Sequence, residues 1–485
     1  MANVKGDIAV AGLAVMGRNL ILNMADHGFT VIAFNRTASK VDEFMAGEAR
    51  GKTIAAAHTV PEMARLLSRP RKVMLMIKAG KAVDEFIELL IPSLEPGDCI
   101  IDGGNSHYSD TMRRAKYLEG KGLLYVGCGV SGGEEGARHG PSLMPGGSAA
   151  AWPLVKNIFT AICAKTPDGS PCCEWMGENG AGHFVKMTHN GIEYGDLQCI
   201  AEAYHIMRDG FGMSLPDIAS VFSAWNKGEL NSYLVEITAK LLTAKDAKGK
   251  FLLDAILDVT GQKGTGKWTS VSSLELGVPV TMMTEAVFSR GLSALKEERT
   301  LAAKMLKGPK KKMSSGNGDS VSNLQKALFG SKIVSYCQGF MLLRKASEEY
   351  LWNLDFGKIA LVWRAGCIIR SAFLDRIKAA FDKNPGQTSL FLDDYFKSAL
   401  DTCQDGWRKT VAAAVEAGIP VPAMSSGLAF YDGFRCNRLP ASLIQAQRDY
   451  FGAHAYERAN MPRGRFFHND WTGKQGETEA GSYNA

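Results

Sequence analysis

Short apolar runs recur through the first third of the chain, separated by longer stretches in which apolar and polar residues mix. The runs cover residues 8–10, 30–34, 72–77, 99–101 and 124–126, and the sequences that follow them are polar or rich in glycine. Apolar runs that alternate with helix-length segments are typical of parallel strands joined by helices. From about residue 178 to about residue 435 the strand pattern stops and long helical periodicities replace it.

This change of pattern divides the chain into three parts. We predict an α/β domain of the Rossmann type over residues 1–178, an all-helical domain over residues 179–438 and a C-terminal tail over residues 439–485. Within the helical part, Gln198 followed by Trp225 is echoed by Gln338 followed by Trp363, and each Trp begins a Trp-x-x-Gly sequence. Such self-similarity indicates a duplicated helical unit.

One predicted helix at the start of the helical part has an unusual polar face. Residues 180–195 place Lys186, His189, Asn190 and Glu193 at positions i, i+3, i+4 and i+7. Because side chains advance about 100° per residue along a helix, these four fall within about 100° of arc. A solvated face is the simplest interpretation of this spacing. The combination of an amine, an imidazole, an amide and a carboxylate nevertheless suits acid–base chemistry.

Composition narrows the class of protein. The 485 residues are 46% hydrophobic, which is enough for two or three domains with large cores. No signal segment and no apolar run of membrane-spanning length is present, and the ten cysteines include no Cys-x-x-Cys pair. We therefore expect a cytoplasmic protein with reduced thiols and no bound metal. The net charge of +6 is compatible with small anionic substrates but does not by itself identify them.

The first apolar run leads into a glycine-containing turn, which predicts a nucleotide site. A strand, a turn with Gly12, Ala14 and Gly17, a helix and a second strand follow one another in the order of a Rossmann unit. The phosphates of a dinucleotide bind at the N-terminus of such a helix. The candidate cofactor contacts in this turn are Gly12, Leu13, Ala14, Val15, Met16 and Gly17.

The end of the second strand indicates which dinucleotide binds. NAD enzymes carry an acidic residue here, whereas this chain has Asn35, Arg36 and Thr37. An arginine can pair with the 2′-phosphate of NADP. We therefore predict NADP as the cofactor, with Arg36 on the 2′-phosphate.

The exits of the later strands supply further candidates. Ligands of parallel sheets bind at the carboxyl ends of the strands. There the sequence places the following cofactor or substrate contacts: Ile77, Lys78, Ala79, Asn105, Ser131, Gly132 and Gly133.

Three features outside the predicted helix of residues 180–195 could bind an anion. Lys263 lies in the glycine-rich segment GQKGTGKWT, which lacks the spacing of a Walker loop, and Arg290 lies on a predicted helix. Arg448 and His454 lie in the tail, and a bend near Gly452 would be needed to bring both to one ligand. A tail so rich in aromatic and charged residues is expected to lie on a partner subunit.

Together these segments resemble one known family over nearly the whole chain. The matching motifs are GLAVMG and NRT, IKAG and DGGN, GVSGGEEGARHGPSLMPGG, KMTHNGIEYG, GQKGTGKWT and RDYFGAH. In these motifs the chain is similar to the decarboxylating 6-phosphogluconate dehydrogenases. The resemblance implies that 6-phospho-D-gluconate and NADP⁺ are converted to D-ribulose 5-phosphate, CO₂ and NADPH in the pentose phosphate pathway. It also implies a homodimer.

Roles for the candidate residues follow from this resemblance. Lys186 would be the base that takes the proton of the C3 hydroxyl, and Glu193 the acid that later protonates C1. The resemblance places Asn105, Ser131, Gly132, Gly133, His189 and Asn190 on the sugar acid, and Tyr194, Lys263 and Arg290 on the phosphate, with Arg448 and His454 arriving from the other subunit.

Two alternatives remain at this point. A related 3-hydroxyacid dehydrogenase, such as one acting on hydroxyisobutyrate, would share the glycine turn and a helix-borne lysine, but it would be shorter and would not need the phosphate-binding cations. A basic helical scaffold for nucleic acid would use the positive charge and the run Lys310–Lys312. The positive residues are dispersed, however, and form no basic stripe.

Overall fold

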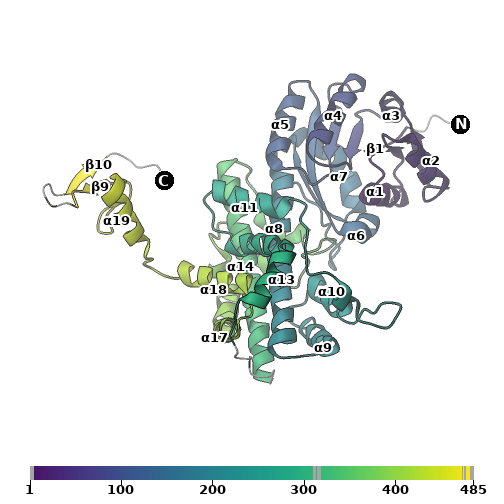
Figure 1. Cartoon of the computed structure of the whole chain (residues 1–485). Coiled ribbons are helices and arrows are strands. Elements are labelled where there is room, and N and C mark those ends of the chain that lie inside the picture. The colour runs from purple at the N-terminus through teal and green to yellow at the C-terminus, as the bar shows by residue number, and fades with distance from the viewer. Residues whose placement is uncertain (1–4, 310–312, 314–317, 472, 474–476, 481–485) are drawn as a thin grey trace. The chain divides into compact units, whose positions relative to one another are not determined.

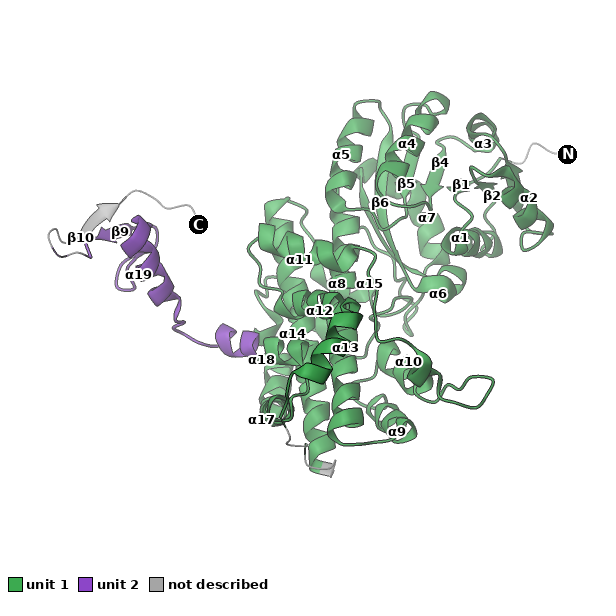
Figure 2. Ribbon diagram, in the orientation of Figure 1, with its two compact units in different colours: residues 1–428 green, residues 429–485 purple. Residues whose placement is uncertain are grey.

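The computed structural model describes residues 5–309, 313, 318–471, 473 and 477–480. The chain divides into two compact units, Met1–Leu428 and Ala429–Ala485 (Figure 2). The predicted boundary near residue 178 lies inside the first unit, and the predicted three-part division stays a prediction. Lys310–Lys312, on which the nucleic-acid alternative drew, lies outside the described residues.

The N-terminal part of the first unit is built around a seven-stranded sheet (Figure 1). Its strands are β1 (Ile8–Ala11), β2 (Val31–Phe34), β3 (Ile54–Ala57), β4 (Lys72–Leu75), β5 (Cys99–Asp102), β6 (Leu124–Ser131) and β7 (Ser142–Gly147). The strand order is β3-β2-β1-β4-β5-β6-β7, and all neighbouring strands are parallel except β6 and β7. The order turns back at β1, where a doubly wound sheet binds its ligand. The predicted Rossmann-type domain is confirmed.

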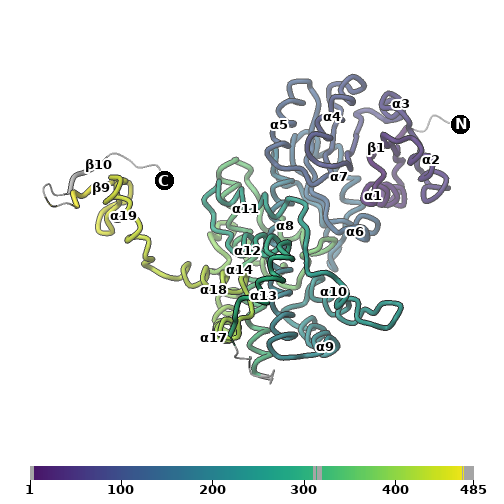
Figure 3. Tube along the Cα trace, in the orientation of Figure 1, coloured from purple at the N-terminus to yellow at the C-terminus, as the bar shows by residue number. Residues whose placement is uncertain are grey.

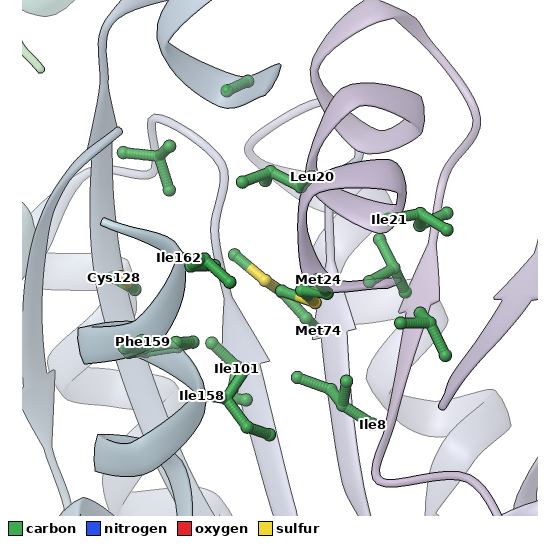
Figure 4. Close-up of a cluster of buried hydrophobic side chains, with 14 of the residues drawn as sticks. Ile8, Leu20, Ile21, Met24, Met74, Ile101, Cys128, Ile158, Phe159 and Ile162 are labelled. Carbon is green, nitrogen blue, oxygen red and sulfur yellow. The ribbon is translucent and has the colours of Figure 1, made fainter. Parts of the chain in front are cut away.

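Helices cover both faces of this sheet. They are α1 (Val15–Asp26), α2 (Ala38–Ala46), α3 (Val60–Leu66), α4 (Lys81–Leu90), α5 (Tyr108–Glu119), α6 (Gly133–His139) and α7 (Trp152–Ile162). Along β1 the side chains alternate between two cores: Ile8 and Val10 join one buried cluster, and Ala9 and Ala11 join the other. Figure 4 shows the first cluster, in which Leu20 of α1 and Phe159 of α7 take part. Burial on both faces explains why the strands read as continuous apolar runs.

Strand boundaries differ from the sequence expectation in three respects. The strands β3 and β7 were not predicted, β4 ends at Leu75 rather than at Ile77, and β6 continues to Ser131. β3 has the sequence Ile-Ala-Ala-Ala, and β7 contains a proline and two glycines. Alanine, proline and glycine are all disfavoured in strands, so only pairing with a neighbouring strand stabilises these segments.

The rest of the first unit is helical, as predicted. Its helices are α8 (Ala181–His205), α9 (Leu215–Trp225), α10 (Tyr233–Leu241), α11 (Thr265–Glu275), α12 (Thr281–Ala294), α13 (Lys296–Met305), α14 (Gly318–Glu349), α15 (Phe356–Val362), α16 (Leu374–Lys383), α17 (Asp394–Ala417) and the first part of α18 (Pro422–Phe434). The two longest, α8 and α14, pack against each other, and α8 also packs on β6 and β7. This second contact places the start of α8 against the sheet.

The two halves of the proposed duplication have a similar order of helices. Gln198 lies on α8 and Gln338 on α14, and each long helix is followed by a shorter one, α9 or α15. Trp225 ends α9, and Trp363 directly follows α15. Duplication of the helical unit stays a prediction.

The second unit is a small helix-and-sheet element (Figure 3). It contains the end of α18, then α19 (Ala441–Gly452), β8 (Tyr456–Glu457), β9 (Phe466–Asn469) and β10 (Glu477–Ala480). The strands form an antiparallel sheet that was not predicted. The buried carboxylate of Asp449 joins helix to sheet, because it accepts hydrogen bonds from His468 Nδ1 (2.9 Å) and Trp471 Nε1 (2.8 Å). The helix ends at Gly452, where the predicted bend was placed.

All ten cysteines are free thiols; nine are buried and Cys436 is exposed. Within the described parts of the chain, no helix is both long enough and apolar enough to cross a membrane.

Candidate active site

A cavity of about 720 Å³ lies within the first unit, between the carboxyl end of the sheet and the helical part. Its walls are the turn after β6, the polar face of α8, the segment before α11, and α12. The lining residues are Met16, Asn105, Val130, Ser131, Gly132, Gly133, Lys186, Asn190, Glu193, Tyr194, Gly261, Gln262, Lys263, Thr265, Arg290 and Ile368. The polar face of α8 therefore faces a cavity rather than bulk solvent, which corrects the simplest interpretation of its spacing.

Lys186 is the most buried cation of this cavity, with 6% of the residue exposed. Its aliphatic stem lies against β6, where a Cβ on Gly129 would come within 2.4 Å of the Lys186 Cβ. Only glycine allows this approach. Burial lowers the pKa of Lys186 to about 8, and the carboxylate of Glu193 partly opposes that shift. At neutral pH a useful fraction of the amine is thus available as a base.

His189 lies one turn further along α8 and is fully buried. Its Nδ1 is 3.1 Å from Asn190 Oδ1 and 3.4 Å from Lys186 Nζ, and its Nε2 is 3.3 Å from Ser131 Oγ. Burial, together with the nearby Lys186, holds the pKa of His189 well below its usual value. The neutral ring can donate from Nδ1 to Asn190 and accept from Ser131, which ties α8 to the turn after β6.

Glu193 lies about two turns from Lys186 on the same face. Its Oε2 is 3.9 Å from His189 Nδ1, and 23% of its side chain is exposed. Burial raises the pKa of Glu193 above the ordinary glutamate value, although Lys186 and Arg290 partly oppose that rise. The cavity thus contains an amine with a lowered pKa and a carboxyl group with a raised one, a pairing suited to base and acid roles.

The other end of the cavity is cationic. The Arg290 guanidinium stacks on Tyr194, with its Cζ 3.5 Å from the ring centroid, and donates to the Gly261 carbonyl oxygen (3.2 Å). Lys263 is exposed in the short segment that precedes α11. The helix begins at Thr265, so the glycine-rich loop is shorter than the motif GQKGTGKWT suggested. Two cations and a tyrosine hydroxyl can together bind a phosphate.

The turn after β1 fits a dinucleotide. Gly12 has a φ of +114°, and a Cβ there would lie 2.4 Å from the Met76 carbonyl oxygen. The next helix, α1, begins at Val15, and among the described residues no side chain caps its first amide groups. These amides are therefore available to a pyrophosphate. Leu13 N donates to Asn35 Oδ1 (3.2 Å), which connects this turn to the end of β2.

Comparison with known proteins shows the same organisation along the whole chain. The profile described as the NAD binding domain of 6-phosphogluconate dehydrogenase matches residues 7–177, and that described as 6-phosphogluconate dehydrogenase, C-terminal domain, matches residues 182–471. The decarboxylating 6-phosphogluconate dehydrogenase of Ovis aries is 59% identical over 482 residues, covering 99% of this chain and 100% of the relative. The corresponding protein of Cunninghamella elegans is 56% identical over 486 residues, covering 100% of both chains.

The chain belongs to the 6-phosphogluconate dehydrogenase family. A solved structure of the Plasmodium falciparum enzyme, described as apo, with its cofactor NADP⁺ and with its substrate 6-phosphogluconate, matches with a TM-score of 0.92 at 43% identity, covering 96% of this chain and 100% of that one. The chain is thus a decarboxylating dehydrogenase with NADP as its cofactor, and the resemblance drawn from its motifs is confirmed. Full-length matches of this kind disfavour both a shorter 3-hydroxyacid dehydrogenase and a helical scaffold for nucleic acid.

In this dehydrogenase the structure brings together most of the candidates for substrate binding. Of those in the first unit, all line the cavity except His189, which lies directly behind its wall. Met16 and Asn105 are the cofactor candidates that reach the cavity. Arg36 and Lys78 are exposed at the ends of β2 and β4. Arg448 and His454 belong to the second unit.

Five lining residues were not assigned a role from the sequence: Val130, Gly261, Gln262, Thr265 and Ile368. The first four lie within the motifs GVSGGEEGARHGPSLMPGG and GQKGTGKWT, so membership of these motifs was the available signal. Ile368 lies between α15 and α16, and nothing in its local sequence points to a ligand. Only the folded chain brings it to the cavity that Lys186 also lines.

Proposed function

We propose that this dehydrogenase converts 6-phospho-D-gluconate and NADP⁺ to D-ribulose 5-phosphate, CO₂ and NADPH in the oxidative pentose phosphate pathway, with Lys186 as base and Glu193 as acid. The observation that carries the assignment of roles is the opposed pair of pKa shifts on one face of α8. The cationic end of the same cavity supports a phosphorylated substrate.

The oxidation begins with a proton transfer to Lys186. The neutral amine takes the proton of the C3 hydroxyl as the hydride leaves C3. The nicotinamide of bound NADP⁺ supplies the acceptor for this hydride. The resulting ammonium of Lys186 then donates a hydrogen bond to the new C3 carbonyl oxygen. That bond favours loss of the C1 carboxylate as CO₂, because the C3 oxygen takes up the electron pair of the broken bond and then the proton of Lys186, which leaves an enediol and a neutral amine.

The remaining enediol needs a proton on the carbon that carried the carboxylate. Glu193, whose raised pKa keeps a larger share of the carboxyl protonated, gives this proton. Lys186 takes back the enediol proton as the ketone forms. The sugar acid would be held by Asn105, Ser131, Gly132, Gly133, His189 and Asn190, and its phosphate by Tyr194, Lys263 and Arg290.

Variants of the two helix residues separate the steps. Lys186→Ala removes the base, so we expect no NADPH formation from 6-phosphogluconate above background. Glu193→Ala retains the base, so NADPH should form in the first turnover while ribulose 5-phosphate release falls by about 100-fold or more, the usual range for loss of a general acid. Absorbance of NADPH and trapping of the sugar product measure the two steps, with hydroxyisobutyrate as control substrate. Normal turnover of Lys186→Ala would contradict these roles.

Arg36 is proposed to bind the 2′-phosphate of NADP. It is exposed at the end of β2, and the described residues provide no hydrogen bond or ion pair to its guanidinium. A free guanidinium at this point suits a phosphate ligand. We expect Arg36→Ala to lower kcat/KM for NADP⁺ by about 10- to 100-fold and to change that for NAD⁺ little, because the lost charge-assisted bonds exist only with the phosphate. An unchanged ratio of the two efficiencies would contradict this role.

A homodimer is proposed as the working form. Large apolar side chains are exposed on three helices of the first unit: Leu274 on α11 (79%), Phe288 on α12 (65%) and Met305 on α13 (72%). On α19 of the second unit, Ile444 (59%) and Phe451 (72%) are exposed as well. Apolar surface of this extent favours a further copy of the chain as partner.

The tail of one subunit would complete the site of the other. Arg448 and His454 lie on and just after α19, next to those exposed apolar side chains. Through them the partner would add a guanidinium and an imidazole to the phosphate end of the cavity. We expect the dimer to act in the cytoplasm, where its ten thiols would stay reduced.

A further inference from the structure

Two buried arginines bind the opposite ends of β4 and β5. Arg71 precedes β4 and donates from Nη1 to Asp98 Oδ2 (2.8 Å), just before β5 begins. Arg114, on α5, donates from Nη1 to Asp102 Oδ2 (3.4 Å), at the end of β5. Cofactors of a doubly wound sheet bind at the carboxyl ends of the strands. The first pair therefore lies at the end away from the cofactor, and the second lies beside the cofactor turns.

The guanidinium of Arg114 reaches two turns at once. Only 1% of the residue is exposed. Its Nε and Nη2 donate to the two carboxylate oxygens of Asp84, at 2.8 and 3.1 Å, and Nη2 also donates to the Gly80 carbonyl oxygen at 3.0 Å. These bonds hold the turn between β4 and α4, which contains Lys78 and Ala79. Although burial alone would lower it, the hydrogen bonds with Asp84 raise the pKa of Arg114, so it stays charged.

The same guanidinium holds the turn after β5 through Asp102. Besides Arg114, Asp102 Oδ2 accepts from Ser106 Oγ (2.6 Å) and Tyr125 OH (3.0 Å), while Oδ1 accepts from Gly104 N (3.1 Å). Gly104 and Ser106 directly flank Asn105. Asn105 is exposed and lines the cavity, whereas Gly104 and Ser106 on either side of it are hydrogen-bonded to Asp102.

We propose that Arg114 is a positioning residue for NADP, which holds the turn of Lys78 and Ala79 and the turn of Asn105 in the arrangement that binds the cofactor. This rests on the proposed function, in which those two turns touch NADP. The planar fork of arginine can serve Asp84, Gly80 and Asp102 together, whereas a lysine amine cannot. Arg114 itself is too buried to meet the cofactor.

The test compares Arg114→Lys with Arg71→Lys in the full-length protein. Both variants keep a positive charge and remove the fork of a buried arginine, so both should lower the melting temperature. We expect Arg114→Lys to raise the Kd for NADP⁺, measured by titration calorimetry without substrate, on the order of tenfold, as for other residues that orient a ligand-binding group. Arg71→Lys should leave this Kd unchanged. Equal weakening by both variants would overturn the proposal, because it would reflect general destabilisation.

A second pair of variants decides the matter if Arg114→Lys does not fold. Asp84→Asn weakens the bidentate bond to Arg114, whereas Arg113→Ala removes the exposed arginine that also binds Asp84. Only the former should raise the Kd for NADP⁺, and an unchanged Kd in Asp84→Asn would overturn the proposal. Asn105→Ala tests the underlying contact separately. If it leaves NADP⁺ affinity unchanged, the proposed cofactor contact is wrong; if it alone weakens binding, positioning by Arg114 is wrong.

Discussion

At the residue scale, Lys186 and Glu193 influence each other through the cavity. The Glu193 carboxylate raises the pKa of Lys186 against the larger effect of burial, which lowers it to about 8. Replacing Glu193 by a neutral residue removes this opposing charge and leaves the effect of burial. The pKa of Lys186 in such a variant must therefore fall further, and the amine becomes a base at lower pH.

The pH dependence of the first turnover tests this coupling. Oxidation needs neutral Lys186, so the wild-type rate of NADPH formation should rise with pH through about 8. In Glu193→Gln this acid limb should move to lower pH. The matched control is Glu135→Gln. Glu135 lies on α6, just after the turn that follows β6, and its side chain is 87% exposed. An acid limb that stays in place in Glu193→Gln would show that the two groups are not coupled.

The positions of these residues on one face were predictable, but their burial was not. Spacing of i, i+3, i+4 and i+7 predicts a shared helical face whatever surrounds it. The pKa shifts come mainly from burial. The residues that enclose this face include β6, the turn at Ser131 and Ile368, which lie far from α8 in sequence. Local periodicity contains no information about such neighbours, and the motif resemblance supplied what periodicity could not.

At the scale of elements, the contact between β6 and α8 sets the depth of Lys186. A methyl group at Gly129 would meet the Lys186 Cβ at 2.4 Å, so the helix or the lysine must move. A displacement of about 1 Å in a catalytic group can lower turnover by about 100-fold. We expect Gly129→Ala to lose turnover on this scale while the protein remains folded.

The control for this prediction is Gly120→Ala at the end of α5, where the nearest neighbour of an added Cβ is an ordinary 3.5 Å away. Melting temperature and the acid limb of NADPH formation should both be measured. A Gly129→Ala enzyme with unchanged turnover and pH profile would show that Lys186 does not depend on this packing.

Two of the strands that sequence reasoning missed, β3 and β7, share one physical cause. The strand pattern was clear where β-branched and other apolar residues were buried on both faces, as in β1 and β5. In β3 and β7 the residues disfavour extended structure, and neighbouring strands stabilise it. The strand β8 has only two residues. Pairing partners cannot be read from such segments before the chain is folded.

At the scale of the whole molecule, the proposed exchange of tails between subunits can be tested with mixed dimers. We expect Lys186→Ala and Arg448→Ala each to impair the site to which the residue contributes. If Arg448 acts on the partner's site, a mixed dimer contains one site with both wild-type residues. If it acts within its own subunit, both sites of the mixed dimer stay impaired.

Co-refolding equal amounts of the two variants should therefore restore activity at low substrate concentration. We expect roughly a quarter of the wild-type rate, since half of the randomly assembled dimers are mixed and each has one intact site. Mixing the folded variants without exchange provides the control. Absence of restored activity in verified mixed dimers would contradict a tail that acts on the partner.

The single exposed thiol of Cys436 gives this protein a practical property. It lies between α18 and α19, where the second unit begins, and the other nine thiols are buried. A maleimide dye should consequently attach at one position without any cysteine being removed. Its fluorescence polarisation would report directly how freely the tail tumbles in each assembly state.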